Sequence, residues 1–288
     1  MEKYNLAFVI NSHYKGQFVV TFYSVTKSNP GASFCVHLLT NSLTPEEKSY
    51  LKDIVVSLGS EIIFYDVDES VFEGLPKMSY DSAYTAYDKL LIPYYIKTGG
   101  KVLYLDCDII VKGDITCLFD REYPAFISAV SDLRINAKRR EHVKKITGGD
   151  YAYFNSGVIM FDFFHAEKVV PLDKMIDYIR ERGEDIRWHD QDILNHFYCA
   201  DCTVLEEKYN YHTTYKSLGD LFFRKGEREA VIVHYANWKP WKSNYIGKSY
   251  RLFSKRYKEC AKKWGVNFAK KRNIFAQFKL ILSYVFRR

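Results

Sequence analysis

The sequence predicts an α/β fold with a mostly parallel mixed sheet, and three observations predict it. Short apolar runs of strand length alternate along the chain with longer segments of helical character. One of the expected helices has a capping box, Thr44 to Glu47, with proline at the first helical position. The run from Val102 to Leu105 follows two glycines and is apolar throughout, as in a strand that is buried on both faces. Together these patterns favour strands joined by crossover helices.

In the first half of the chain, expected strands and expected helices alternate. Strands are expected at 6–10, 34–39, 61–65 and 102–105, and helices at 18–27, 45–58 and 84–96, the last interrupted near Pro93. This order is Rossmann-like. No Gly-x-Gly-x-x-Gly motif follows the first strand, however, so a nicotinamide or flavin cofactor loses support.

The second half repeats the alternation around more polar segments. Strands are expected at 125–130, 156–161 and 231–233, and helices at 172–182 and from 189 onward, while 134–150 is polar and has no expected element. Neither an internal repeat nor a low-complexity linker interrupts the chain. Residues 1–245 are therefore expected to form a single catalytic domain, with 246–288 as a basic, aromatic C-terminal helical tail.

Two carboxylates follow the apolar run at 102–105. Asp106 and Asp108 lie at the carboxyl end of that strand, where open α/β sheets bind their ligands. Residues two apart in an extended chain point the same way, so the two carboxylates are expected on one side. Like charges this close repel unless a cation lies between them, and oxygen ligands suit magnesium, manganese or calcium. The alternative is that Asp-Cys-Asp is only a polar turn.

Several separated segments, each a strand or a helix start followed by polar groups, together resemble the family-8 glycosyltransferases. The resemblance extends over roughly residues 4–245, and the segments that carry it are Ala7–Tyr14, Tyr84–Leu90, Val102–Asp108, Phe154–Gly157, Asp190–Asn195 and His234–Trp241. It implies a GT-A fold. It also implies an enzyme that transfers a hexose from a UDP-sugar with retention of the anomeric configuration.

The resemblance implies a metal site made by Asp106, Asp108 and His234. These residues would hold Mn²⁺ or Mg²⁺ against the diphosphate of the UDP-sugar donor. Lys239 would add a positive charge at the same diphosphate. For His234 the alternative is a core histidine at a strand end, and the Lys-Pro-Trp sequence that begins at Lys239 favours the ligand.

The end of the first strand would hold the uridine, with Asn11 at the base and Tyr14 stacked on it. Asn11 stands where the family commonly has an acidic residue, but an amide can both donate and accept. Lys89 stands where the family often has arginine, and it keeps the charge without the bidentate fork. Asn237 replaces a usual glycine. These departures bear on which base and which sugar are recognised, and they do not change the reaction class that the resemblance implies.

Asn155, Asp190 and Gln191 would line the donor sugar, with Gln191 beneath the anomeric carbon. Because no carboxylate is firmly placed there, a covalent two-step route is hard to argue. We therefore expect a same-face route, in which the departing diphosphate takes the acceptor's proton and the Gln191 amide stabilises the transient cation. Asp132, just past the strand at 125–130, is a candidate acceptor contact or simply a loop acid.

The net charge of +7 is concentrated in the tail, because residues from Lys242 onward carry +13 and those before them −6. Basic and aromatic residues interleave there, and 274–286 is too short to span a bilayer, which takes about 20 apolar residues. This segment fits an interfacial helix on an anionic membrane surface, the alternative being a solvated basic face that covers the core. The acidic body and the lack of a reading motif argue against nucleic acid.

We expect the chain to act in the cytoplasm, at the inner face of the cell membrane, because no signal peptide precedes the first strand. It would move glucose or galactose to a glycan or glycolipid acceptor such as lipopolysaccharide. One alternative is a catalytically weak sugar-nucleotide binding protein. Another is a nucleotidyltransferase, which would need a glycine-rich triphosphate loop near the first strand, and Asn11–Tyr14 is not one.

Overall fold

The computed structural model describes residues 3–76, 84–85, 87–132, 135, 137–213, 226–236, 239–241 and 250–267. These residues fall into two compact units. The first comprises Met1–His13, Ala32–Asp106 and Thr116–Glu206, and the second comprises Tyr14–Gly31, Cys107–Ile115 and the described residues from Glu207 onward. The expected segments at 274–286 and at Asn237 lie outside the described residues.

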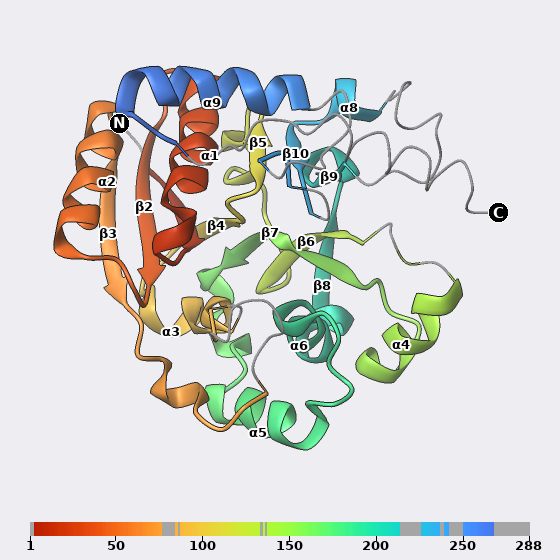
Figure 1. The fold of residues 1–288 in the computed structure, drawn as a ribbon. Coiled ribbons are helices and arrows are strands. Elements are labelled where there is room, and N and C mark those ends of the chain that lie inside the picture. The colour runs from red at the N-terminus through yellow and green to blue at the C-terminus, as the bar shows by residue number, and fades with distance from the viewer. Residues whose placement is uncertain are drawn as a thin grey trace, which may run out of the picture. The chain divides into compact units, whose positions relative to one another are not determined.

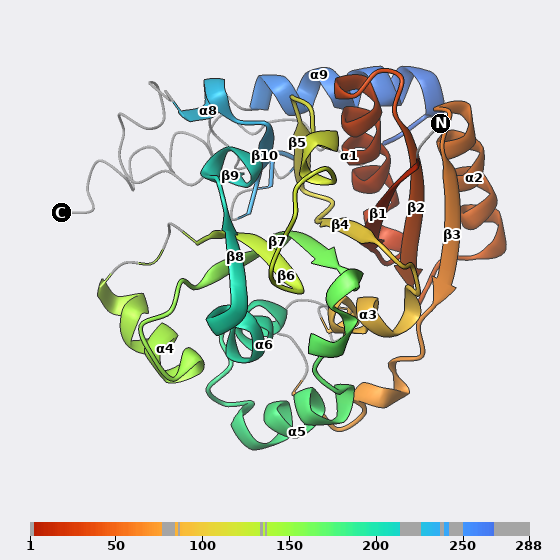
Figure 2. The ribbon, with the colours of Figure 1, turned by 180° about the vertical axis from the view of Figure 1, so that it is seen from behind.

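The first unit is built on a seven-stranded mixed sheet in the order β3-β2-β1-β4-β7-β6-β8. Its strands are β1 (Lys3–Val9), β2 (Ser33–Thr40), β3 (Glu61–Asp66), β4 (Lys101–Leu105), β6 (Ile127–Ser131), β7 (Phe154–Asp162) and β8 (Cys202–Leu205). β1 pairs in parallel with β2 and β4, β2 with β3, and β6 with β8, whereas β7 runs antiparallel to both β4 and β6. Figure 2 shows β3 and β8 at the two opposite edges of this sheet.

Five α-helices of the described residues belong to the first unit: α2 (Pro45–Ser57), α3 (Ile92–Tyr95), α4 (Ala137–Thr147), α5 (Leu172–Arg182) and α6 (His189–Tyr198). α2 lies beside β3 (Figure 1). Its capping box is confirmed, because the Thr44 side chain accepts the N–H of Glu47 and the Glu47 carboxylate accepts the N–H of Thr44.

A single large apolar core fixes α3, α5 and α6 in the first unit. It joins side chains of the sheet, such as Tyr104 and Phe126, to Ile92 of α3, Ile179 of α5 and Ile193 of α6. Burying side chains of this size contributes roughly 1.5–3 kcal/mol each. The polar N-terminus of α6 is therefore held in place by its own apolar face.

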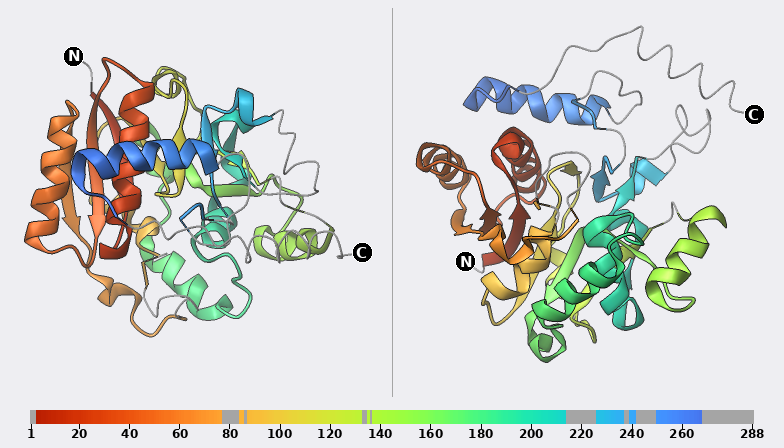
Figure 3. Two further views of the ribbon diagram at one scale, coloured as in Figure 1. Left: turned by 45° about the horizontal axis from the view of Figure 1, so that its top comes forward. Right: turned by 60° about the horizontal axis from the view of Figure 1, so that its bottom comes forward.

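The second unit combines a long helix pair with a small sheet. Its elements are α1 (Lys15–Ser28), β5 (Ile109–Val111), β9 (Tyr211–His212), α8 (Gly226–Glu229), β10 (Ile232–His234) and α9 (Tyr250–Trp264). The sheet has the order β5-β10-β9, with β10 antiparallel to β5 and parallel to β9. α9 packs across α1 (Figure 3), where the ring centroids of Tyr23 and Trp264 are 5.4 Å apart.

Three sequence expectations about elements were wrong. The helix expected at 84–96 consists of a 3₁₀ turn, Asp88–Leu91, followed by the one-turn helix α3. Pro93 lies in the first turn of α3, where its missing N–H costs no helical hydrogen bond, so it starts a helix. The polar stretch after Arg134 contains α4, and Ile109–Val111 and Cys202–Leu205 are strands that were not expected.

Candidate active site

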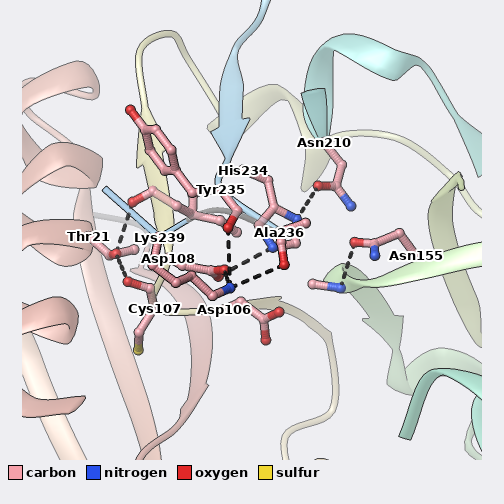
Figure 4. A network of polar contacts seen from close by, with 12 residues as sticks. Thr21, Asp106, Cys107, Asp108, Asn155, Asn210, His234, Tyr235, Ala236 and Lys239 are labelled. Carbon is pink, nitrogen blue, oxygen red and sulfur yellow. Dashed lines mark hydrogen bonds and ion pairs between the residues drawn. The ribbon is translucent and has the colours of Figure 1, made fainter. Parts of the chain in front are cut away.

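The second unit brings Asp108, His234 and Lys239 together. β10 pairs with β5 in antiparallel register so that His234 lies opposite Ile109, directly after Asp108. The Nε2 atom of His234 is 3.3 Å from Asp108 Oδ1, and the Lys239 ammonium forms an ion pair with Asp108 Oδ2 (Figure 4). The structure thus brings these three residues together within this unit, and their roles toward a metal and a diphosphate stay a prediction.

The backbone around Asp108 is held on both sides by hydrogen bonds. The Thr21 hydroxyl of α1 lies 2.9 Å from the carbonyl oxygens of both Cys107 and Ile109. On the other side, the N–H of Tyr235 donates to the Asp108 carbonyl over 2.9 Å. Figure 4 shows these contacts around the Asp108 side chain. The carboxylate is thus presented by a loop whose position is fixed before any ligand binds.

The orientation of the His234 ring is set by a residue that the sequence motifs did not identify. Nδ1 of His234 lies 2.8 Å from Oδ1 of Asn210, an oxygen that can only accept, so Nδ1 carries the proton. Nε2 then faces Asp108. Holding the far ring nitrogen in this way is typical of histidines that bind metals.

The charge on Asp108 is strongly favoured in this arrangement. Burial alone would raise the pKa of its carboxyl group, because desolvation disfavours a charge. Lys239 and His234 outweigh that effect and hold the pKa of Asp108 well below its usual range. Asp108 is therefore ionised at every pH at which the protein is expected to work.

Asp106 completes a possible set of metal ligands with Asp108, its neighbour but one in the chain. One ligand atom from each of Asp106, Asp108 and His234 lies within 4.8 Å of the other two. Among the described residues, this is the one group of three or more His, Cys, Asp or Glu side chains with ligand atoms so close together. Two carboxylate oxygens and one imidazole nitrogen are a donor set that suits manganese or magnesium. The residues present therefore fit the metal that the sequence implies.

In the first unit, a buried lysine joins Asp106 to Asp190. The Lys89 ammonium lies 3.3 Å from Asp106 Oδ1 and 2.7 Å from Asp190 Oδ2, over the face of the Tyr104 ring. Burial works to lower its pKa, but the two carboxylates outweigh burial and raise the pKa of Lys89. The Ser156 hydroxyl donates to the same Asp190 oxygen over 2.7 Å. Lys89 thus neutralises two acids that would otherwise repel each other.

The side chain of Gln191 is held at both ends of its amide. Its oxygen accepts from Asn155 Nδ2 at 2.8 Å and from the Ser156 N–H at 3.4 Å. Its nitrogen donates to Asp132 Oδ2 at 3.1 Å. Asn155, Asp132 and Gln191 are all buried, so these contacts are shielded from water. The first unit therefore brings together all the residues that were expected to line the donor sugar, with Asp132 beside them.

A buried aspartate organises the start of α6. Asp192 Oδ2 accepts the N–H groups of Arg187 and Trp188 at 2.7 and 2.9 Å. These bonds hold the turn in which His189 takes φ 47°, a left-handed conformation that is uncommon for residues other than glycine. The strained turn directs Asp190 and Gln191 from the helix start toward β7.

Two further side chains tie Asp192 to its surroundings. His142 of α4 lies 2.9 Å from Asp192 Oδ2, and the Tyr153 hydroxyl donates to Oδ1 at 2.5 Å. Burial first, and then the charge of Asp192, raise the pKa of the Tyr153 hydroxyl, which therefore stays a donor. The Asp192 carboxylate thus joins α4 and α6 to Tyr153, the residue directly before β7.

Asn11 and Tyr14 lie at the end of β1 and the start of α1. The Asn11 side-chain oxygen accepts the N–H of His13 at 3.1 Å, so this asparagine shapes the turn after the strand. The Tyr14 ring is half-buried and packs edge-on to Trp241, with ring centroids 6.4 Å apart. Their contacts with a uridine remain a prediction.

Sequence reasoning missed Asn210 and the roles of Ser156 and Tyr104. Ser156 lies inside a quoted motif, so its position could have suggested a role. Asn210 precedes the two-residue strand β9, whose pairing with β10 brings it to His234. Nothing in the local sequence indicates that pairing, because a strand of two residues has no periodicity to read.

Three comparisons with known proteins agree with one another. The family model described as glycosyl transferase family 8 matches residues 5–245. General stress protein A of Bacillus subtilis (strain 168) is 30% identical over 224 residues, which cover 73% of this chain and 77% of that protein. The lipopolysaccharide 1,2-glucosyltransferase of Escherichia coli is 25% identical over 261 residues, covering 86% of this chain and 77% of that protein.

Among solved structures, the galactosyltransferase LgtC in complex with donor and acceptor sugar analogues superposes with a TM-score of 0.76. The match covers 88% of this chain and 95% of that chain, at 22% sequence identity. At this identity the likeness establishes the fold. The expected GT-A architecture with a mostly parallel central sheet is thereby confirmed.

Proposed function

Because the chain belongs to glycosyl transferase family 8 and is therefore a hexosyltransferase, we propose that it transfers glucose or galactose from UDP to a bacterial surface glycan. The reaction retains the anomeric configuration and uses a divalent cation. The names of similar proteins support both the sugar class and the acceptor class, since they include a lipopolysaccharide 1,2-glucosyltransferase and a lipopolysaccharide 1,3-galactosyltransferase.

The observation that carries this proposal is the pairing of Asp108 with a histidine whose ring is already oriented. His234 Nε2 faces the Asp108 carboxylate while Asn210 holds Nδ1. Because Nδ1 is already bonded to Asn210, the lone pair of Nε2 faces the carboxylate, and a cation between them would bind both. A divalent cation held by Asp106, Asp108 and His234 would offset the negative charge that develops on the leaving diphosphate.

The side chains of this site have separate tasks during transfer. The bond between the anomeric carbon and the diphosphate oxygen breaks, a bond from the acceptor hydroxyl oxygen to that carbon forms, and the hydroxyl proton passes to the departing diphosphate. Lys239 supplies a positive charge on the side of the diphosphate. Asp190, held by Lys89 and Ser156, accepts hydrogen bonds from the donor sugar's hydroxyl groups.

The held amide of Gln191 favours a one-step, same-face transfer. Both ends of that amide have fixed partners, so its dipole is oriented before the sugar becomes cationic. An amide does not form the stable glycosyl ester that a carboxylate nucleophile forms in retaining glycosidases. Mass spectrometry of the wild-type protein with its donor is expected to find no glycosyl adduct, and an adduct at Asp190 would contradict this route.

The acceptor's location suggests contact with a membrane surface. α9 buries Phe253 and Cys260 and exposes only cations at five positions along one side, which are Arg251, Lys255, Lys258, Lys262 and Lys263. The aromatic side of α9 packs within the second unit, where Phe253 contacts Tyr235. This helix would therefore approach anionic headgroups by charge, without inserting its aromatic residues. No helix of the described residues is long and apolar enough to cross a membrane.

The direct test is release of UDP from UDP-glucose, UDP-galactose and UDP-N-acetylglucosamine, with Mn²⁺ or with a chelator. We expect release from at least one of the two hexose donors, its loss with the chelator, and its loss in Asp108→Asn. A catalytically weak sugar-nucleotide binding protein would instead bind the donors and release no UDP. That result would replace the proposed transferase activity with binding.

A further inference from the structure

A cavity beside Gln191 belongs to none of the residues expected to hold the donor. It has a volume of about 300 Å³ and is lined in the first unit by Ser131, Asp132, Ile135, Arg140, Val143, Lys144, Gly149, Asp150, Tyr151 and Tyr153. This volume lies at the small end of the range for small-molecule sites. The cavity is therefore large enough for a single sugar ring but small for an extended saccharide.

One residue of the cavity lining contacts Gln191 directly. Asp132 is 4% exposed, and its carboxylate accepts a hydrogen bond from Gln191 Nε2. Its backbone is fixed as well, because the Asp132 N–H donates to the Tyr153 carbonyl over 2.8 Å. A group bound in the cavity thus lies next to the residue that would sit beneath the anomeric carbon.

The rim offers an aromatic face that is held in place. Tyr151 is 47% exposed, and its ring lies so close to Gly149 that a Cβ atom there would come within 2.9 Å of it. Gly149 therefore allows the ring to pack against the backbone at the end of α4. Exposed aromatic faces beside polar groups suit the apolar face and the hydroxyl groups of a sugar ring.

Arg140 differs from the neighbouring cations of α4 in having no partner among the described residues. Three cations of this helix are engaged, since Arg139 lies over the Trp188 ring, Lys144 pairs with Asp150 and Lys145 pairs with Asp185. Within the part of the chain that the structure describes, Arg140 has no hydrogen-bond or ion-pair partner. Lys144 pairs with Asp150, and the Asp132 carboxylate accepts from Gln191, so Arg140 is the cation of the described lining that is paired with no anion.

α4 is a rigid wall for this cavity. His142, on the same helix, is bound to Asp192, and Val143 and Ile146 pack with Tyr153. The helix ends at Gly148, whose N–H donates to the Lys144 carbonyl and whose φ of 72° suits glycine. Arg140 is therefore presented at a fixed place relative to Asp132.

We propose that this cavity is the acceptor subsite and that it takes a sugar residue carrying a phosphate or carboxylate group, with Arg140 as the group that recognises the anion. This assignment rests on the proposed function, because only a transferase needs an acceptor beside Gln191. Asp132 would accept a hydrogen bond from an acceptor hydroxyl group, and the ring would lie against Tyr151. An exposed guanidinium is suited to either anion by its bidentate geometry.

Binding to the full-length protein tests the proposal without requiring catalysis. Glucose 6-phosphate, glucuronate and methyl glucoside are titrated by nuclear magnetic resonance into the wild type, Arg140→Gln and the control Lys145→Gln, whose lysine lies on the same helix and outside the cavity lining. We expect at least one anionic sugar to bind about fivefold more tightly than the neutral one, a modest factor because Arg140 is exposed and screened. Arg140→Gln should abolish that preference, and Lys145→Gln should keep it.

The two anionic probes separate phosphate from carboxylate recognition. Equal affinity of the wild type for all three sugars would overturn the proposal, as would an equal loss of neutral and anionic binding in Arg140→Gln. Donor hydrolysis without acceptor, measured in parallel, reports on the proposed function alone. If hydrolysis is absent while Arg140 still selects anionic sugars, the cavity is a binding site and its role as acceptor subsite is contradicted.

Discussion

At the scale of single residues, the site depends on two sets of opposite charges, each built around a buried ion, Lys89 or Asp108. Lys89 lies between Asp106 and Asp190, and Asp108 lies between Lys239 and His234. Each charge would be costly alone, because burial disfavours an unpaired ion. The chemistry of the site therefore depends on keeping each set complete.

Replacing Lys89 tests the first of these sets. Lys89→Met leaves Asp106 and Asp190 without their shared cation, and we expect a loss of about 3 kcal/mol in the free energy of unfolding. Donor turnover should fall at least about a hundredfold, since Asp190 also loses its orientation. Urea unfolding and UDP release measure the two effects, with the exposed Lys174→Met as the control. An unchanged free energy of unfolding, together with a turnover within twofold of wild type, would show that this lysine is dispensable.

Asp88 is buried without such compensation and should make stability depend on pH. Burial first, and then the nearby Glu69, raise the pKa of Asp88 to about 8, and neither of its carboxylate oxygens has a hydrogen-bond partner. The folded state then holds a proton that the unfolded state releases above its ordinary pKa. Stability should fall as pH rises from about 4 to 8, by at most about 1.4 kcal/mol per pH unit from this group.

The variant Asp88→Asn removes that titration. Its unfolding free energy should decline less between pH 5 and 8 than that of wild type, whereas the exposed Asp177→Asn should follow the wild-type curve. Urea unfolding at four pH values measures the slopes. Identical slopes for wild type and Asp88→Asn would contradict a proton held by this carboxyl group.

At the scale of elements, the position of Asp190 and Gln191, the proposed catalytic residues, depends on how α6 begins. Asp192 collects hydrogen bonds from two backbone N–H groups, from Tyr153 and from His142, and so fixes a turn that contains the strained His189. Asp190 and Gln191 point from this turn. The orientation of the first turn of α6 is therefore set by Asp192, which is not among the residues proposed to bind the donor.

Weakening the hydrogen bonds of Asp192 should lower both the stability of the protein and its rate of turnover. In Asp192→Asn one carboxylate oxygen becomes an NH₂ group, which cannot accept the hydrogen bonds that this oxygen accepts. We expect a loss of about 2 kcal/mol in unfolding free energy. The rate of turnover should fall more than the donor affinity changes, because Gln191 loses its alignment. Separate measurement of kcat and KM, with Asp173→Asn as control, checks this. A variant that unfolds like wild type would contradict the role of Asp192.

Sequence patterns predicted the elements that have a clear signal. The capping box at Thr44 and the apolar run at 102–105 each follow a local rule, and both are confirmed. α4 was missed because its segment is mostly charged and offers Val143 and Ile146 as its only large apolar residues. Strands of two to four residues, such as β9 and β8, form through pairing with distant strands, which no local pattern reveals.

The candidate site was predictable to the extent that its residues lie in motifs. The motifs contain Asp106, Asp108, His234 and Lys239, whose roles in holding a metal and a diphosphate stay a prediction. Asn210, which contacts the His234 ring, and Arg140, the unpaired cation of the described cavity lining, could not be predicted. Their importance comes from a β-pairing and from the engagement of neighbouring cations, and both are properties of the fold.

At the scale of the whole molecule, the family is established, and the cations of α9 support the proposed contact with a membrane surface. The resemblance seen in the motifs is confirmed by the family model over residues 5–245. The α9 cations lie on the outward side of a helix whose apolar side is already packed. A surface of this kind is expected to bind anionic lipids reversibly and in a salt-dependent way.

Vesicle co-sedimentation tests this surface. Reversing three cations in Lys255→Glu, Lys258→Glu and Lys262→Glu should abolish most binding to anionic vesicles, because each basic residue near the surface contributes about 1 kcal/mol. The control reverses Lys52, Lys97 and Lys174, which are exposed on other elements. Equal pelleting of the α9 variant and the wild type would remove α9 from the membrane contact.

Asp106, Asp108 and His234 are proposed to bind one divalent cation together. Titration of the protein with Mn²⁺, followed by the electron paramagnetic resonance signal of the free ion, measures this directly. We predict one site in the wild type that tightens when UDP is added, with affinity reduced at least about tenfold in Asp108→Asn and in His234→Ala, and unchanged in Asp177→Asn. Equal Mn²⁺ binding by the wild type and both site variants would contradict the account.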